Sequence, residues 1–247
     1  MTEIKKIGTI KLIICDDLKN TAKHGAKIFA EAIRKKSDLV LGLATGGTPV
    51  ELYKELIRMN KEGALSFRQV NSFNLDEYLG LAGDHPQSYR YFMNKNLFDH
   101  IDIEKSNTHV PDGTSENPDI SCKQYEESIK EANGIDLQLL GIGSNGHIAF
   151  NEPGSSLTSR TRVVDLKENT INDNARFFSN KSEVPKKAVT MGIGTILEAK
   201  KIVLIATGAN KKDAVSKSLN GKPNPNIPAS FLQNHPDCTF IIDNEAS

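Results

Sequence analysis

The sequence contains few cysteines, and they form no pattern. Cys15, Cys122 and Cys238 are odd in number and far apart, without C-x-x-C spacing. This argues against a disulfide framework or a structural zinc site and fits a reducing cytosol. Charged residues interrupt every apolar run, so none approaches the ~20 residues of a membrane span. We therefore expect a soluble, cytoplasmic protein with three inert thiols and no membrane partner.

An excess of charge of either sign is also missing. Lysine plus arginine and aspartate plus glutamate both number 31, so the formal net charge is zero. No overall positive field exists to attract nucleic acid, which we therefore do not expect as a partner. The histidines are scattered, without an H-x-x-x-H pair or a carboxylate-rich loop, so no metal site is expected. A net charge of zero does not exclude a local basic pocket for a small anion.

Short apolar runs alternate with amphipathic segments along the whole chain. Strands are expected at 11–17, 38–44, 69–75, 135–143, 160–166, 187–192, 201–208 and 238–243. Helices are expected at 22–36, 49–60, 88–101, 122–134, 194–201 and 210–219. The alternation predicts one doubly wound α/β domain over 1–247, with a mainly parallel sheet covered by helices on both faces. Ligands of such sheets bind beyond the carboxyl ends of the strands, so the strand-to-helix loops are the places to search.

The first of these loops lies in LATGGTPVELY (43–53). Thr48 suits the N-cap of a helix and Pro49 its first position. Gly46 and Gly47 leave backbone N–H groups free to face an anion, which the helix dipole favours. The stretch matches neither G-x-G-x-x-G nor G-x-x-x-x-G-K-[ST], so a nucleotide is not indicated. It is either a phosphate site or a tight turn that needs positive φ.

Two further loops carry groups that can move protons. Asp76 and Glu77 follow a strand, where one of them can serve as a general base; the alternative is a solvated acidic pair or a helix cap. In GIGSNGHIAFNEPGSS (141–156), His147 can act as acid or base near neutral pH, with Glu152 orienting its ring. A structural histidine is the alternative there.

Basic side chains follow later in the chain. SRTRVVDL contributes Arg160 and Arg162, and NARFF contributes Arg176. Lys211 and Lys212 stand at the start of a helix after a buried strand. Surface charge is the usual meaning of such residues, but lysine is unexpected at a helix N-terminus for dipole reasons, and a bound phosphate would remove that mismatch.

These motifs together carry a family resemblance. LGLATGGTP, FNLDEY, HPQSY, GIGSNGHIAFNEPGSSLTSRTR and NARFF occur in this order, and from about residue 10 to about residue 243 the chain resembles the glucosamine-6-phosphate deaminases (glucosamine/galactosamine-6-phosphate isomerase family). The resemblance implies a Rossmann-like fold and an enzyme of amino-sugar catabolism. Its reaction would convert D-glucosamine 6-phosphate and water into D-fructose 6-phosphate and ammonia. No metal or organic cofactor is implied, because the substrate's own nitrogen serves as the electron sink.

The resemblance also implies roles for single residues. His147, tuned by Glu152, would open the sugar ring, and Asp76 would remove the C2 proton and return one to C1. Some members have aspartate where this chain has Asn145, which can orient the imidazole but cannot offset its charge. The phosphate anchors that carry over are Thr45, Gly46, Gly47, Thr48, Arg176 and Lys211.

Regulation is expected to differ from that of some relatives. Those relatives are hexamers activated by N-acetylglucosamine 6-phosphate, through a basic residue two positions after the second arginine of SRTR and a longer C-terminal tail. Here that position is Val164, and the sequence ends at Ser247. We expect a monomer or small homo-oligomer without this activation.

Two other functions are compatible with these motifs. A 6-phosphogluconolactonase shares the fold and a similar glycine-histidine loop, but lactone hydrolysis needs no C2 base, which leaves Asp76 without a comparable task. A non-catalytic sugar-phosphate-binding module, such as the effector domain of a transcription regulator, would be expected to carry a helix-turn-helix segment and a basic face. The segment 85–91 is expected to form a mobile cover.

Overall fold

The computed structural model describes residues 2–175, 178, 180 and 183–247 of the chain. Its main sheet has eight strands in the order β1-β2-β11-β10-β7-β3-β4-β6. The β1–β2 pair is antiparallel, and the other neighbours in this sheet are parallel. The strand bounds are β1 Glu3–Ile7, β2 Ile10–Cys15, β3 Val40–Leu43, β4 Asn71–Asn74, β6 Thr108–His109, β7 Leu137–Leu140, β10 Ile202–Ala206 and β11 Cys238–Asp243. The predicted mainly parallel α/β sheet is confirmed.

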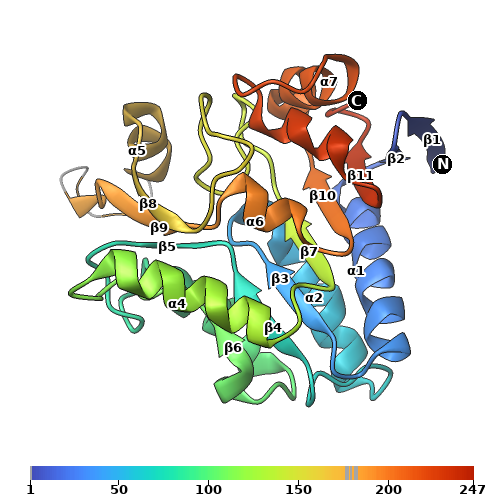
Figure 1. Ribbon diagram of the computed structural model, residues 1–247. Helices are drawn as coiled ribbons and strands as arrows, with labels where there is room; N and C mark the ends of the chain where they lie inside the picture. The colour runs from blue at the N-terminus through green and yellow to red at the C-terminus, as the bar shows by residue number, and fades with distance from the viewer. Residues whose placement is uncertain (1, 176–177, 179, 181–182) are drawn as a thin grey trace.

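Helices flank this sheet on both sides. The helices of the described residues are α1 Leu18–Lys35, α2 Gly47–Lys61, α3 Tyr89–Asn96, α4 Pro118–Glu131, α5 Glu168–Ala175, α6 Ile193–Leu197 and α7 Lys212–Asn220, with 3₁₀ turns at Phe98–His100, Lys105–Asn107, Ala209–Lys211 and Pro228–Asn234. Right-handed crossovers place α1, α2 and α3 on one face and α4, α6 and α7 on the other. In Figure 1, α4 and α6 lie in front of the sheet and α2 lies behind it.

The packing of α1 shows how local sequence sets this arrangement. Asp17 caps the helix by accepting the backbone N–H of Asn20 at 2.7 Å. Gly25 on its buried face allows close approach to α2, since a Cβ there would lie 2.6 Å from Cδ1 of Leu52. The core strands β3, β7, β10 and β11 are buried along their whole length. Continuous apolar strands under two helical layers are what a parallel sheet requires.

A second, smaller sheet was not foreseen. It has the order β5-β9-β8 and is antiparallel, with β5 Asp76–Tyr78, β8 Arg162–Asp165 and β9 Lys187–Thr190. Strands were predicted at 160–166 and 187–192, but not that they would pair outside the main sheet. The sequence of β5, DEY, is too short and polar to be read as a strand. This sheet has its own small core of Tyr78, Phe150, Leu166 and Ala188.

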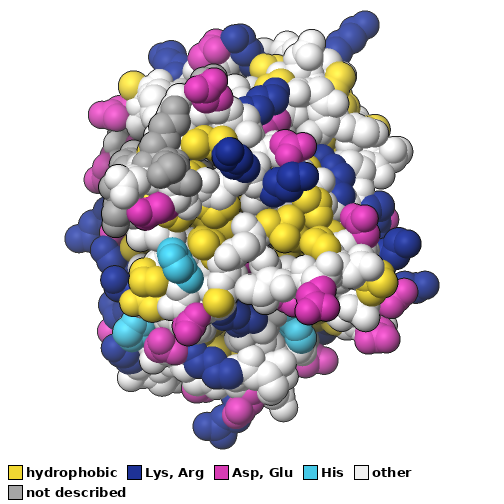
Figure 2. Space-filling model, turned by 90° about the vertical axis from the view of Figure 1, so that its left-hand side faces the viewer, with side chains coloured by type: hydrophobic (Ala, Val, Ile, Leu, Met, Phe, Trp, Pro, Cys, Tyr) yellow, Lys and Arg dark blue, Asp and Glu magenta, His cyan; other side chains and the backbone are white. Residues whose placement is uncertain are grey.

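The surface agrees with the balanced composition. Figure 2 shows lysine and arginine interspersed with aspartate and glutamate on one face, without a large area of one sign. Within the part of the chain that the structure describes, no helix combines the length and the apolar character needed to span a bilayer. The three cysteines are buried free thiols. That residues 1–247 form a single domain stays a prediction.

Candidate active site

The strand order places a crevice next to β3 and β7. The chain leaves β3 toward β4 and leaves β7 toward β10, so the crossover direction reverses between these two neighbours. Ligands of open α/β sheets bind at such a reversal, beyond the carboxyl ends of the strands. A cavity of about 270 Å³ lies there. Its lining includes the predicted residues Thr45, Gly46, Gly47, Thr48, Asp76, His147 and Lys211.

The turn after β3 forms one wall of this cavity. Gly46 has φ 105°, a conformation that favours glycine, and α2 begins at Gly47 rather than at Pro49. The predicted N-cap at Thr48 is therefore wrong, because Thr48 lies within the helix. No described side chain caps this helix, so its first N–H groups are available to an anion in the cavity.

Lys211 lines the cavity from the turn that follows β10, the strand next to β7. It ends the 3₁₀ turn that follows β10, whereas Lys212 begins α7. The turn is fixed by Gly208, whose N–H donates to both carboxylate oxygens of Asp243 at 3.0 Å. A lysine and a helix N-terminus therefore face the same cavity and provide the electrostatics of a phosphate site. Arg176, the other predicted anchor, lies outside the described residues.

Asp76 lies where β4 gives way to β5. Its side chain is 6% exposed, so the alternative of a solvated acidic pair is wrong. Burial, and then the charge of Glu77, raise the pKa of Asp76 to about 8. A carboxyl group with a pKa near the working pH is suited to take a proton and return it.

Glu77 caps the start of α3 in addition to Ser88, the N-cap residue, and so matches the helix-cap alternative that the sequence left for this pair. Its carboxylate accepts the backbone N–H groups of Tyr78 at 2.8 Å, Tyr89 at 2.9 Å and Arg90 at 2.9 Å. Burial raises the pKa of Glu77, although these three bonds act in the opposite direction. Glu77 thus holds the start of α3 against β5.

His147, Asn145 and Glu152 form a hydrogen-bonded group. Asn145 Nδ2 donates to Glu152 Oε2 at 2.7 Å, and Asn145 Oδ1 lies 2.8 Å from His147 Nδ1. Because Nδ2 of Asn145 donates to Glu152, Oδ1 faces the imidazole, and an amide oxygen can only accept a hydrogen bond. Nδ1 therefore carries the hydrogen in this arrangement, and Nε2 is the basic nitrogen of the neutral ring.

Glu152 also acts on the imidazole directly. Its Oε1 lies 3.6 Å from His147 Nδ1, and both side chains are largely shielded from water. Gly143 makes room for the ring, because a Cβ there would lie 2.2 Å from His147 Cε1. The structure thus brings Asn145, His147 and Glu152 together as predicted.

Tyr89 is a cavity residue that the sequence did not single out. Its ring lies parallel to that of Phe150, with centroids 6.1 Å apart, and 4.8 Å from that of Tyr78. The HPQSY motif that contains Tyr89 was the only signal for it. The mobility expected of the segment 85–91 stays a prediction.

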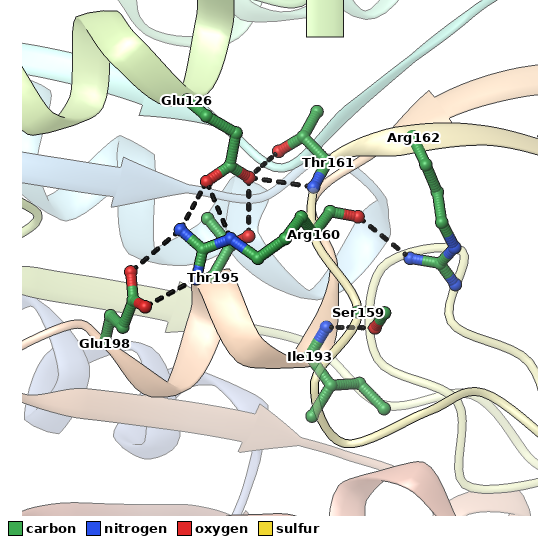
Figure 3. A network of polar contacts seen from close by, with 8 residues as sticks. All are labelled: Glu126, Ser159, Arg160, Thr161, Arg162, Ile193, Thr195 and Glu198. Atoms are coloured by element: carbon green, nitrogen blue, oxygen red, sulfur yellow. Dashed lines mark hydrogen bonds and ion pairs between the residues drawn. The ribbon is translucent and has the colours of Figure 1, made fainter. Parts of the chain in front are cut away.

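Arg160 and Arg162 have protein partners instead of an anion. Arg160 bridges two carboxylates, with Nε 3.1 Å from Glu126 Oε2 and Nη2 2.9 Å from Glu198 Oε2. Arg162 donates to Asn151 Oδ1 at 3.0 Å. Figure 3 shows this polar network between α4, α6 and the segment 159–162. Among the described residues, no three histidine, cysteine, aspartate or glutamate side chains are grouped so that they could hold a metal ion.

Comparisons with known proteins point to one family. The family described as "Glucosamine-6-phosphate isomerases/6-phosphogluconolactonase" matches residues 17–241. The chain is 58% identical over 238 residues to the glucosamine-6-phosphate deaminase of Shewanella woodyi, covering 96% of this chain and 90% of the relative. It is 54% identical to that of Clostridium perfringens, covering 96% and 98%.

Solved structures are similar as well. One described as a monomeric glucosamine-6-phosphate deaminase superposes with a TM-score of 0.93 at 46% identity, covering 95% of this chain and 98% of that chain. The 6-phosphogluconolactonase from Trypanosoma cruzi superposes with a TM-score of 0.74 at 25% identity, covering 95% and 94%.

Proposed function

The chain belongs to the family of glucosamine-6-phosphate isomerases and 6-phosphogluconolactonases, and from this premise we propose that it is a glucosamine-6-phosphate deaminase. It converts D-glucosamine 6-phosphate and water into D-fructose 6-phosphate and ammonia. The observation that carries the proposal is the buried carboxyl group of Asp76, which lines the same cavity as His147. An aldose–ketose isomerisation needs such a base beside a group that handles the sugar oxygens.

Phosphate binding positions the substrate. The turn formed by Thr45, Gly46, Gly47 and Thr48 offers N–H and hydroxyl donors, and Lys211 adds a positive charge. Arg176 is the further anchor that the resemblance implies. A phosphate held at this end of the cavity fixes the opened sugar chain with C2 near Asp76, which lowers the entropy cost of the reaction.

Ring opening is the task of His147. Nε2 exchanges a proton with the anomeric hydroxyl and the ring oxygen, so that the C1–O5 bond breaks and the aldehyde forms. Asn145 keeps the hydrogen on Nδ1, and Glu152 stabilises the imidazolium that forms in passing. The amide of Asn145 and the buried carboxylate of Glu152 thus set the orientation and the charge of the ring.

Asp76 carries the isomerisation. It removes the proton from C2, the electron pair forms a C1–C2 double bond, and the aldehyde oxygen O1 takes up a proton from solvent to give an enolamine. Asp76 then returns a proton to C1, which leaves a C2 iminium. Water adds to C2, and ammonia departs to leave the ketone of fructose 6-phosphate. The C1 aldehyde accepts the electron pair in the first step, and the lone pair of the substrate nitrogen forms the iminium in the second, so these steps need only the substrate, water and the chain's own residues.

A 6-phosphogluconolactonase is the main alternative. The higher identity and TM-score of the deaminase structure support the deaminase. Burial of Asp76 at the cavity supports it too, since lactone hydrolysis uses no base at C2. A non-catalytic sugar-phosphate-binding module would not need the ordered group of Asn145, His147 and Glu152.

Release of ammonia and fructose 6-phosphate from glucosamine 6-phosphate tests the proposal. The wild type and Asp76→Asn would be assayed with EDTA present throughout, and 6-phosphogluconolactone would serve as a parallel substrate. Equal amounts of both products, abolished by the substitution, would support the deaminase and its cofactor-free route. Lactone hydrolysis without ammonia, or binding without turnover, would overturn it.

We also propose a cytoplasmic, single-domain monomer or small homo-oligomer without activation by N-acetylglucosamine 6-phosphate. The structure described as a monomeric deaminase supports this assembly. Val164 supports the absence of activation, because it packs against the small core around Tyr78 and offers no charge to a phosphate. Light scattering would give the mass of the assembly. Sigmoidal kinetics that the acetylated sugar made hyperbolic would contradict the absence of activation.

A further inference from the structure

A buried amide links the two catalytic segments. We propose that Asn151 is a positioning residue that fixes the His147–Glu152 turn relative to Asp76, and that Arg162 acts through it. Asn151 is fully buried and directly precedes Glu152. The catalytic part of this inference rests on the proposed deaminase function, whereas the hydrogen bonds of Asn151 do not depend on that function.

The turn that Asn151 closes is strained. Ala149 has φ 50°, a left-handed conformation that is costly for a residue with a Cβ. The backbone N–H and the side-chain Nδ2 of Asn151 both donate to the carbonyl oxygen of Ile148 at 3.0 Å. Strain of this kind persists where the surroundings over-determine it, and the two bonds of Asn151 supply that constraint. The turn has His147 on one side and Glu152 on the other.

The same amide nitrogen connects this turn to the base. Asn151 Nδ2 donates to the carbonyl oxygen of Met191 at 2.8 Å. The N–H of Met191 in turn donates to the carbonyl oxygen of Leu75 at 2.7 Å, and Leu75 directly precedes Asp76. Two hydrogen bonds through the backbone of one residue, Met191, therefore link Asn151 to the segment that carries Asp76.

Thr190 provides a second link beside the first. It pairs with Asp76 across β5 and β9, and its Oγ1 accepts the N–H of Phe150 at 3.1 Å. The end of β9 is thus bound both to the strand of Asp76 and to the turn that follows His147. A shift of this turn would change the distance between the base and the imidazole.

Arg162 fixes the orientation of the Asn151 amide. Its Nη1 donates to Asn151 Oδ1 at 3.0 Å, so a flipped amide would lose this bond and place oxygen against two carbonyl groups. Arg162 is half-buried, and burial lowers its pKa, because its described partners are neutral oxygens that do not offset the loss of water. The partly desolvated guanidinium of Arg162 therefore holds the side-chain amide of Asn151 in one orientation.

Arg162 itself extends from a firmly held segment. Glu126 on α4 accepts the N–H of Thr161 at 2.8 Å and the hydroxyl of Thr195 at 2.6 Å, and it pairs with Arg160. Figure 3 shows these contacts on one side of the segment and the guanidinium of Arg162 on the other. The network thus holds the backbone of the segment 159–162 in place, and Arg162 extends from this segment to Asn151.

Kinetics of ammonia release test the coupling, with Asn151→Ala, Arg162→Met and the double variant. We expect each single variant to lower kcat by roughly tenfold to a hundredfold, as small misplacements do. KM should stay within about threefold, because the phosphate anchors are untouched. The double variant should lose little more than Asn151→Ala alone, since Arg162 acts through Asn151. Lys187→Gln, an exposed charge on the same β9, is the matched control and should behave as wild type.

Hydrogen–deuterium exchange gives a readout that does not depend on turnover. Exchange should rise in peptides covering 143–152 and 187–192 in both single variants and stay unchanged in Lys187→Gln. If the wild type releases no ammonia, the deaminase proposal fails, and exchange alone decides whether Asn151 and Arg162 hold the turn. Unchanged exchange, kcat within twofold of wild type, or independent losses that multiply in the double variant would overturn the inference.

A fold-preserving variant covers the case in which Asn151→Ala does not fold. Arg162→Lys retains a donor of nearly the same reach, whereas Arg162→Met retains only the stem. Partial recovery of kcat in the lysine variant supports the hydrogen bond to Asn151. Equal losses in the two variants contradict it.

Discussion

Asp76 and Glu77 are neighbours in β5, but their carboxyl groups have different surroundings. Asp76 lines the cavity, whereas Glu77 accepts three backbone N–H groups at the start of α3. Both are buried, at 6% and 2% exposure. The carboxylate of Glu77 that binds the start of α3 therefore also acts electrostatically on Asp76. Together with burial, which is the larger cause, it raises the pKa of Asp76 to about 8.

Glu77→Gln should move the pH dependence of the enzyme. The substitution removes the charge that helps to raise the pKa of Asp76, so that pKa should fall. The base is then ionised at lower pH, and the acidic limb of the kcat/KM profile shifts to lower pH. The profile would be measured for both proteins from mildly acidic to mildly alkaline pH.

The exposed Asp84, in the loop before α3, supplies the control for this shift. Asp84→Asn removes a charge of the same sign and should leave the acidic limb in place. Glu77→Gln also weakens the cap of α3, at a cost of about 1 kcal/mol in the free energy of unfolding. A folded Glu77→Gln protein whose acidic limb stays in place, or moves to higher pH, would disprove the coupling.

Gly143→Ala should impair catalysis while the protein remains folded. The new Cβ would lie 2.2 Å from Cε1 and 2.3 Å from Nδ1 of His147, so the imidazole must move away. We expect kcat to fall by roughly tenfold or more, because the ring loses its place at the ligand. Steady-state kinetics and the melting temperature would be measured together. Gly221→Ala, which meets only an ordinary contact at 3.4 Å, is the control; equal kcat values in the two variants would contradict the prediction.

The sequence predicted the site better than it predicted the sheets. Loops after buried strands are recognisable from apolar runs followed by glycine, and three such loops, after β3, β7 and β10, converge on one cavity. The strand β5 was missed because DEY contains two carboxylates. Its burial depends on the N–H groups of Tyr89 and Arg90, which lie 12 and 13 residues away from Glu77. Local patterning carries no information about such a partner.

Other errors also arise from contacts that are distant in sequence. The edge strand β1, EIKKI, is exposed along most of its length and lacks the apolar alternation that identifies a strand. Arg160 was interpreted as surface charge, and its pairing with Glu126, 34 residues before it, could not be predicted from the local sequence. The N-cap assigned to Thr48 failed because Gly46 adopts a positive φ that starts the helix earlier.

Lys211→Gln and Lys212→Gln should have different effects on KM, because only one of the two adjacent lysines lines the cavity. Lys211 lines the cavity, whereas Lys212 begins α7. A charged hydrogen bond to phosphate contributes about 1.5–3 kcal/mol, so Lys211→Gln should raise KM for glucosamine 6-phosphate by roughly tenfold to a hundredfold. Lys212→Gln should change KM by less than about threefold. Initial rates over a range of substrate concentrations decide this, and equal KM values for the two variants would refute the assignment.

Asp136 is expected to stabilise the fold in a pH-dependent way. Its nearly buried carboxylate accepts from Lys36 at 2.6 Å, Lys200 at 2.7 Å and the N–H of Val40 at 2.9 Å. Burial alone would raise the pKa of Asp136, but these bonds outweigh it and hold the pKa below its usual range. A carboxyl group whose pKa is lowered by folding stabilises above its unfolded pKa, and that contribution is lost as the pH falls through the folded value.

Asp136→Asn should therefore lower the free energy of unfolding by about 2 kcal/mol at neutral pH. The difference from wild type should shrink in acid, where the native carboxyl group is protonated as well. Urea unfolding at neutral and at acidic pH measures both values. Asp165→Asn removes an ion pair of 3.5 Å whose aspartate is 82% exposed, and it should have little effect at either pH. A loss in Asp136→Asn that is the same at both pH values would mean that its packing, and not its charge, stabilises the sheet.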